Sequence, residues 1–234
     1  MVRERFSQDV IREIESSAVL SDEGIQLEIL RGKIVIEPFS VENLQSSSYD
    51  LTLGEHYFVR VYTEPGVMNI YNQEVVKKIW GESNKAILTK DLKKKRFIPG
   101  DFWNGIGEED SIIVVPPKGV LLVHSQEFAG ARDDYTTMVK SKSTLERLGV
   151  TTAISAGLGD VGFINRWTFL LRNEHENSEV ILKVGMPFAQ IVFIKCTPTE
   201  ARYVSSGGRY QSTEDLQELM NSWRPEDMLP RVPI

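Results

Sequence analysis

Short runs of β-branched and aliphatic residues follow one another between residues 33 and 194, and turn-forming residues separate them. β-Branched side chains favour strands, whereas Gly, Pro, Asn and Asp favour the turns between strands. The runs occupy residues 33–37, 56–61, 111–115, 119–124, 168–171, 179–184 and 190–194. Since helical patterns do not alternate with these runs, the chain is predicted to form an all-β barrel or sandwich.

Helices are predicted before the first strand and once between the predicted strands. Residues 6–14 carry apolar side chains at helical spacing behind a candidate N-cap, Ser7. A second helix is predicted over 21–30, with Ser21 as its cap. A further helix fits residues 74–80.

The C-terminal pattern over residues 212–223 is also helical. Ser212 and Asp215 have the spacing of a capping box, and Pro225 follows the last turn. The apolar stripe consists of Leu216, Leu219, Met220 and Trp223. Such a stripe is typical of a helix that packs on its own barrel or on a neighbouring subunit.

Composition excludes several classes of protein. The chain has 234 residues with 27 Lys+Arg and 33 Asp+Glu, a formal net charge of −6, which disfavours a pure nucleic-acid-binding domain. No apolar run has the length of a membrane helix, and the charged N-terminus has no signal-peptide core, so a cytoplasmic protein is expected. The single cysteine, Cys196, excludes an intrachain disulfide and a Cys-rich zinc site.

Several common catalytic motifs are missing from the sequence. It has no G-x-x-x-x-G-K-[ST] phosphate loop and no G-x-G-x-x-G that opens a helix after a strand. The signature of zinc-dependent deaminases cannot be written with one cysteine. His56, His124 and His175 are isolated from one another, and a lone strand histidine such as His124 is typically a hydrogen-bonded structural residue.

Polar residues concentrate in four segments at predicted strand ends: 46–54, 140–149, 156–163 and 185–190. The second segment combines lysines, an arginine and hydroxyl groups, which together suit anionic oxygens. The third is a glycine-rich turn that presents one carboxylate, Asp160, beside the ring of Phe163. Asp160 is either a functional group or a turn cap, and Lys142 and Arg147 either bind anions or form an interface salt bridge.

Residues 62–110 resemble an insertion between the predicted strands. They contain a basic cluster, Lys90, Lys93, Lys94, Lys95 and Arg96. Charge runs of this kind are usually solvated faces, and a contact with phosphate or a partner is the alternative.

Taken in order, the polar segments closely resemble those of dCTP deaminases, which belong to the trimeric dUTPase-like superfamily. The matching stretches are 20–23, 32–39, 42–45, 48–54, 116–117, 143–149, 156–160, 185–191 and 208–211. The resemblance covers about three quarters of the chain. It omits the first helix, much of 62–110 and the tail.

The resemblance implies a mainly β, jelly-roll-like distorted barrel in one domain. A helical segment would span 1–32, the barrel 33–200 with an insertion at about 62–110, and a closing segment and helix 201–234. It also implies a homotrimer whose nucleotide sites lie at subunit interfaces. The implied ligand is dUTP or dCTP, and Mg²⁺ would arrive on its phosphate oxygens rather than on protein ligands.

The resemblance further implies a role for particular residues. Asp160, Arg147 and Ser143 would be catalytic. Substrate would be bound by Lys142, Thr144, Ala156, Phe163, Gln190, Tyr203, Arg209 and Tyr210. In this scheme Ser143, Thr144 and Lys142 hold phosphates, Asp160 lies by the sugar and the attacking water, and the Tyr203 to Tyr210 segment closes over the triphosphate.

One position departs from the deaminase pattern. Deaminases of this family use a glutamate on the strand after the Gly-Asp turn as the base for water attack at C4 of cytosine, and counting from Asp160 places Leu170 there. Loss of a general base typically costs about 10²–10⁴-fold in rate. The next carboxylate, Glu174, would be about 13 Å further along a regular strand.

Three functions therefore remain open from the sequence. The first is hydrolysis of dUTP, or a related deoxynucleotide, to the monophosphate and pyrophosphate with Asp160 as the water-positioning base. The second is zinc-independent dCTP deamination, alone or coupled to hydrolysis. The third is a trimer that binds nucleotide without turning it over.

Overall fold

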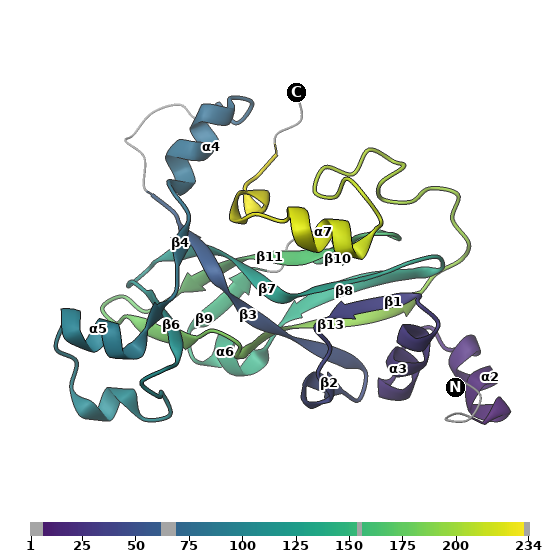
Figure 1. Cartoon of the computed structure of the whole chain (residues 1–234), viewed down its shortest axis with the longest axis horizontal. Coiled ribbons are helices and arrows are strands. Elements are labelled where there is room, and N and C mark those ends of the chain that lie inside the picture. Colours follow the sequence, from purple (N-terminus) through teal and green to yellow (C-terminus); the bar gives the residue numbers. More distant parts are fainter. Residues whose placement is uncertain (1–6, 62–68, 154–155, 232–234) are drawn as a thin grey trace.

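The structure, a computed structural model, describes residues 7–61, 69–153 and 156–231 (Figure 1). Its strands are β1 (Ile34–Glu37), β2 (Leu44–Gln45), β3 (Ser48–Val59), β4 (Asn84–Lys85), β5 (Ile87–Leu88), β6 (Ser111–Val115), β7 (Val120–Ala131), β8 (Tyr135–Ser141), β9 (Val150–Ala153), β10 (Leu158–Gly159), β11 (Ile164–Asn173), β12 (Val180–Lys183) and β13 (Pro187–Lys195).

Short helices lie between and beyond these strands. They are α2 (Gln8–Ser16), α3 (Asp22–Leu30), η1 (Val41–Asn43), α4 (Gln73–Trp80), α5 (Thr89–Lys95), η2 (Gly100–Trp103), α6 (Ser143–Arg147), α7 (Leu216–Ser222) and η3 (Pro225–Met228), where η marks a 3₁₀ helix. Among the residues described, no helix has the length and apolar character needed to cross a membrane.

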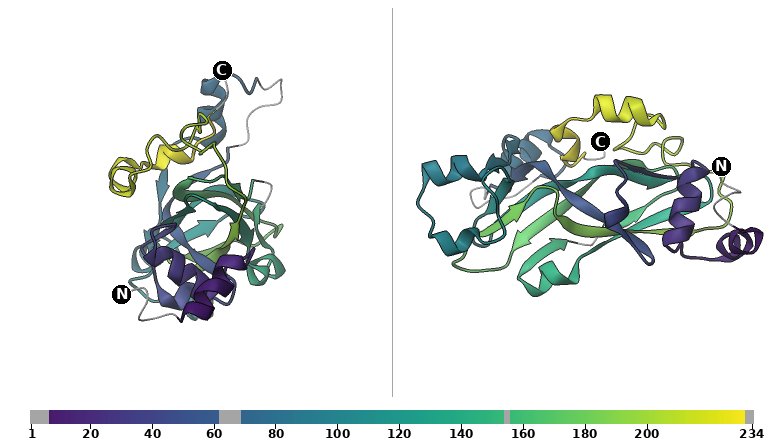
Figure 2. Two further views of the ribbon diagram at one scale, coloured as in Figure 1. Left: turned by 90° about the vertical axis from the view of Figure 1, so that its right-hand side faces the viewer. Right: turned by 60° about the horizontal axis from the view of Figure 1, so that its bottom comes forward.

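The main sheet is antiparallel and runs in the order β10-β8-β13-β3-β7-β11-β9. Strand β1 also pairs with β7, and β2 and β4 also pair with β3. Strands β12, β6 and β5 form a second, smaller sheet in that order. Seen along the long axis, the strands curl around a common core (Figure 2). The mainly β barrel fold predicted from the sequence is therefore confirmed.

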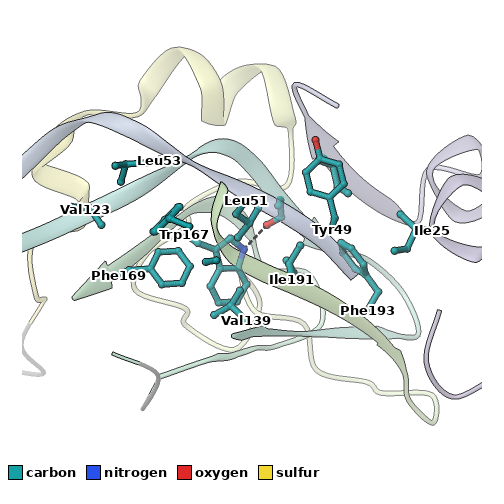
Figure 3. Close-up of a cluster of buried hydrophobic side chains, with 14 of the residues drawn as sticks. Ile25, Tyr49, Leu51, Leu53, Val123, Val139, Trp167, Phe169, Ile191 and Phe193 are labelled. Carbon is teal, nitrogen blue, oxygen red and sulfur yellow. Dashed lines mark hydrogen bonds between the residues drawn. The ribbon is translucent and has the colours of Figure 1, made fainter. Parts of the chain in front are cut away.

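The core lies inside the curl because alternate residues of the long strands point inward. On β11 the inward residues Trp167, Phe169 and Leu171 are buried, and they meet side chains of β3 and β13 (Figure 3). The Trp167 indole is also held by a hydrogen bond from Nε1 to the Ala129 carbonyl, 2.9 Å long. On the outward face of β11, Arg166 and Thr168 line a cavity.

Both predicted N-terminal helices are present, as α2 and α3, at the opposite end of the long axis from α5 (Figures 1 and 2). The predicted start of the first helix, residue 6, lies outside the described residues. The Ser21 hydroxyl accepts a hydrogen bond from the Gly24 amide, and Gly32 has the positive φ of 75° that ends the helical turn. The predicted helix over 74–80 is α4.

The basic cluster lies on and just after α5, a helix that was not predicted from the sequence. Four of its five cations are paired with acidic neighbours. The ion pairs are Lys90–Glu109, Lys93–Glu108, Lys94–Asp91 and Arg96–Glu179. This pairing supports the interpretation of the cluster as a solvated face.

The C-terminal helix is shorter than predicted. It begins at Leu216, and its cap is Asp215, whose carboxylate accepts from the Glu218 amide at 2.8 Å. The predicted start at Ser212 is wrong because Gln211 is buried against β11, and the chain turns only after it leaves that contact. The apolar stripe packs on the protein's own barrel, against residues of β1, β7 and β11.

Candidate functional site

The glycine-rich turn between β10 and β11 places Asp160 at the barrel surface. Gly159 must lack a side chain, because a Cβ there would lie 2.4 Å from the Thr137 hydroxyl and 2.6 Å from the Trp167 ring. The Phe163 amide donates to the Asp160 carbonyl and closes the turn. The Asp160 carboxylate has no hydrogen-bond or ion-pair partner among the described residues, so it does not act as a turn cap through any of them.

Two cavities meet at Asp160. One, here called the polar cavity, has a volume of about 550 Å³ and a mixed lining whose polar side chains include Thr136, Arg202, Ser206 and Arg209. The other, of about 340 Å³, has a mainly aromatic and apolar wall of Phe163, Trp167, Trp223, Met228 and Pro230, with Ala156, Arg166 and Thr168 beside it. Asp160, Tyr203 and Tyr210 line both cavities.

A row of aromatic rings connects the barrel to the segment that closes the site. Phe163 packs edge-on against Trp167 at 5.1 Å and against Tyr203 at 4.9 Å between ring centroids. The Tyr203 hydroxyl accepts a hydrogen bond from the Tyr210 amide. These contacts fix Tyr203 and Tyr210, two of the residues expected to bind substrate, beside Asp160.

Two side-chain amides hold the same segment on β11. Gln211 accepts from the Ile164 amide at 2.7 Å and donates to the Gly162 carbonyl at 2.9 Å, which mimics a strand pairing. Asn165 donates to the Tyr210 carbonyl at 2.6 Å. No role was predicted for either amide, because Asn165 lies outside the matching stretches and Gln211 is only the last residue of the stretch 208–211.

The other expected site residues gather around α6 and β13. The Lys142 ammonium forms a 2.5 Å ion pair with Asp50, whose carboxylate also accepts from Gln190 Nε2 at 3.1 Å. Asp50 is only 4% exposed. It belongs to the polar segment 46–54, and its partner Lys142 lies far along the chain.

Ser143, Thr144 and Arg147 are exposed on α6. Their side chains have no hydrogen-bond or ion-pair partner within the described part of the chain. The linings of the two cavities around Asp160 include no residue of α6. One chain therefore presents the expected site residues in two separate groups.

Leu170, which the resemblance predicts to stand at the position of the deaminase glutamate, packs against an apolar cluster. The cluster contains Trp80 of α4, Leu122 of β7, Met228 of η3 and Leu229. Strand β11 pairs in regular register from Thr168 to Arg172 with β7, so no bulge brings Glu174 nearer. Glu174 instead accepts a hydrogen bond from the Thr151 hydroxyl.

His124 is a satisfied structural residue, as its pattern predicted. Its ring covers Gly54, where a Cβ would lie 2.0 Å from the imidazole. Nδ1 lies 2.7 Å from the Ser125 carbonyl, and Nε2 lies 3.3 Å from the His56 amide, so a neutral ring with its proton on Nδ1 satisfies both contacts. Burial lowers the pKa of His124 to about 3, which keeps the ring neutral.

A buried carboxylate, Glu127, lies on β7. Its oxygens accept from the Thr52 amide at 2.9 Å and from the Thr52 hydroxyl at 2.7 Å, and the residue is 2% exposed. Burial raises the pKa of Glu127 above its ordinary value, and the hydrogen bonds from Thr52 oppose that rise. The Glu127 carboxyl group therefore binds a proton more tightly in the folded protein than in the unfolded chain.

Glu127→Gln is expected to reduce the loss of stability at rising pH. Because the folded pKa is raised, the stabilisation is complete below the unfolded pKa and is lost as the pH rises through the folded pKa, at about 1.4 kcal/mol per unit of pKa difference. Urea unfolding from pH 4 to 8 measures this, with exposed Glu42→Gln as the matched control. Parallel curves for wild type and Glu127→Gln would contradict the assignment.

Among the described residues, no three His, Cys, Asp or Glu side chains group in a way that could hold a metal ion. Asp160 offers a carboxylate to both cavities, and Asp227 alone joins it, in the aromatic one. This donor set is too small for a protein cage, but it is compatible with an ion that a phosphate ligand carries.

Comparison with known proteins identifies the family of this chain. Residues 19–196 match the family model described as dCTP deaminase-like. The dCTP deaminase of Ignicoccus hospitalis is 26% identical over 216 residues, 92% of this chain and 98% of that protein. The dUMP-forming dCTP deaminase of Methanobrevibacter smithii is 30% identical over 189 residues, 80% of this chain and 85% of that protein.

Among solved structures, the 2'-deoxycytidine 5'-triphosphate deaminase of Agrobacterium tumefaciens aligns with a TM-score of 0.49 and 16% identity, over 76% of this chain and 48% of that one. The family model covers most of the chain, and the similar proteins are named as enzymes. This chain is an enzyme of the dCTP deaminase-like family.

Proposed function

We propose that the protein hydrolyses a deoxynucleoside triphosphate of the dUTP type to the monophosphate and pyrophosphate. The observation that supports this proposal is the Asp160 carboxylate, which has no partner in the described ranges and lies where the polar and the aromatic cavity meet. A nucleotide has an anionic end and a base end, and its α-phosphorus lies between them. A carboxylate at that point can orient and deprotonate the attacking water.

The proposed reaction balances without a further reactant. The water oxygen forms a bond to the α-phosphorus, its proton moves to Asp160, and the bond from phosphorus to the bridging oxygen breaks as pyrophosphate leaves. Arg209 is the cation of the polar cavity that has no ion pair with a described residue. Arg202, in the same cavity, already pairs with Asp133 and Glu214.

Mg²⁺ would accompany the nucleotide, with phosphate oxygens as its main ligands. Bound there, the ion would neutralise part of the triphosphate charge and polarise the reacting phosphoryl group. The chain's own contribution is to position the water through Asp160 and to bind phosphate oxygens through Arg209.

A second copy of the chain would complete the site. Ser143, Thr144 and Arg147 carry exposed hydroxyl and guanidinium groups that suit phosphate, yet they lie apart from Asp160 within one chain. A homotrimer whose interfaces bring α6 of one subunit to Asp160 of the next would join the two groups. In that assembly Lys142, held by Asp50, would position the start of α6 and its hydroxyl groups.

Deamination of dCTP, with or without hydrolysis, is the second candidate, because several relatives are named dUMP-forming dCTP deaminases. The side chain at position 170 argues against it. Leucine cannot take a proton from water, and its apolar neighbours offer no substitute base.

Incubation of the protein with dUTP and separately with dCTP, each with Mg²⁺, distinguishes these functions. Pyrophosphate and dUMP from dUTP, with no ammonia from dCTP, is the expected result. Ammonia from dCTP would establish deamination and show that another group acts as the base. Absence of both products would contradict the proposal.

A further inference from the structure

The aromatic cavity contains one cation, Arg166, that has no ion pair within the described part of the chain. Arg166, on the outward face of β11, lies between two rings: its guanidinium carbon is 5.1 Å from the centroid of Phe128 and 4.5 Å from that of Trp223. Its Nε is buried without a hydrogen-bond partner. Its side chain forms no ion pair or hydrogen bond with any residue that the structure describes.

The nearby acidic groups do not neutralise Arg166. Asp227 lines the cavity, but its carboxylate accepts from the Arg224 amide and pairs with Arg231 at 2.6 Å. Glu55 and Glu127 act on Arg166 only through longer-range attraction, and burial lowers the pKa of its guanidinium despite them. A buried donor group without a partner is costly, so this site favours a ligand that supplies acceptors.

The segment that holds Arg166 in place lies beyond the part of the chain that matches the family model. Trp223, the residue after α7, packs on Arg166 and also on His124, with 4.7 Å between the Trp223 and His124 rings. Met228 and Pro230 close the same cavity. The stacked guanidinium therefore has a fixed place, and its N–H groups are the donors on offer to a bound ligand.

We propose that Arg166 donates to the C4 carbonyl oxygen of a pyrimidine base and selects a 4-oxo base over a 4-amino base. The inference rests on the proposed function, because the base must occupy the aromatic cavity while the phosphates occupy the polar one. A guanidinium has only donors, so it matches O4 of uracil and opposes the amino group of cytosine. Apart from Asp160, the described lining offers no unengaged carboxylate to accept from that amino group.

Binding of non-hydrolysable α,β-imido analogues tests this selectivity. Arg166→Met keeps an apolar stem against Trp223 and removes the donors. We expect it to weaken the dUTP analogue by about 10–100-fold, the range for a hydrogen bond to a charged group, and to leave the dCTP analogue and inorganic tripolyphosphate nearly unchanged. Arg172→Met, on the same outward face of β11 but exposed, is the matched control.

Arg166→Lys is a second variant in case Arg166→Met does not fold. It keeps the charge and one donor group, so it should retain part of the preference for the dUTP analogue. Equal losses for both nucleotide analogues, or a comparable loss for tripolyphosphate, would overturn the proposal. Because binding is measured without turnover, a protein that fails to hydrolyse dUTP can still confirm or refute the role of Arg166.

Discussion

Asp160→Asn is expected to lower the rate of dUTP hydrolysis by about 10²–10⁴-fold, the usual contribution of a general base. The amide keeps the size of the carboxylate but cannot accept the proton of the attacking water. Since the Asp160 carboxylate has no partner among the described residues, the fold should not depend on its charge. Pyrophosphate release measures the rate, and calorimetric titration with the α,β-imido dUTP analogue measures binding.

The affinity of Asp160→Asn for the analogue should remain close to that of the wild type. Asp101→Asn, an exposed aspartate in η2, is the matched control and should retain full activity. Wild-type turnover by Asp160→Asn would remove Asp160 from the mechanism and with it the proposed use of the two cavities.

The second large effect is recovery of activity when two inactive variants share one assembly. Asp160→Asn lacks the base, and Arg147→Ala lacks a phosphate-binding cation on α6. If each site of a trimer takes Asp160 from one subunit and Arg147 from the next, every trimer that contains both variants has about one third of its sites intact. Co-expression of the two variants with different tags, followed by purification on both tags, allows the measurement.

Two differently tagged copies of Arg147→Ala provide the control and should remain inactive. Recovery in the mixed sample alone would establish that a site spans two subunits. No recovery, with both variants folded and assembled, would show that each chain builds its site alone and that the exposed α6 residues have another role.

The strands that the sequence predicted are those with continuous aliphatic runs, such as β6 and β12. β8 was not predicted because lysine and hydroxyl residues interrupt it, although Tyr135, Thr137 and Val139 alternate inward as in any half-buried strand. α5 was missed for a related reason. Its sequence is rich in lysine, and Leu92 is its only buried apolar side chain.

Only those residues of the candidate site that lie within local sequence motifs could be predicted. The glycine-rich turn and the resemblance pointed to Asp160 and Phe163, and the closing segment to Tyr203 and Tyr210. Arg166 could not be identified, because its significance depends on Trp223, which lies far away in sequence and reaches it only through the fold. Periodicity alone cannot indicate such contacts.

Hydrolysis of dUTP in ¹⁸O-labelled water tests the central claim most directly, since it reports which phosphorus the water attacks. Asp160 lies between the aromatic cavity and the polar cavity, so the water that it positions should attack the α-phosphorus. The label is therefore predicted to appear in dUMP and not in pyrophosphate. Label in pyrophosphate, or release of inorganic phosphate in place of pyrophosphate, would contradict the position assigned to Asp160.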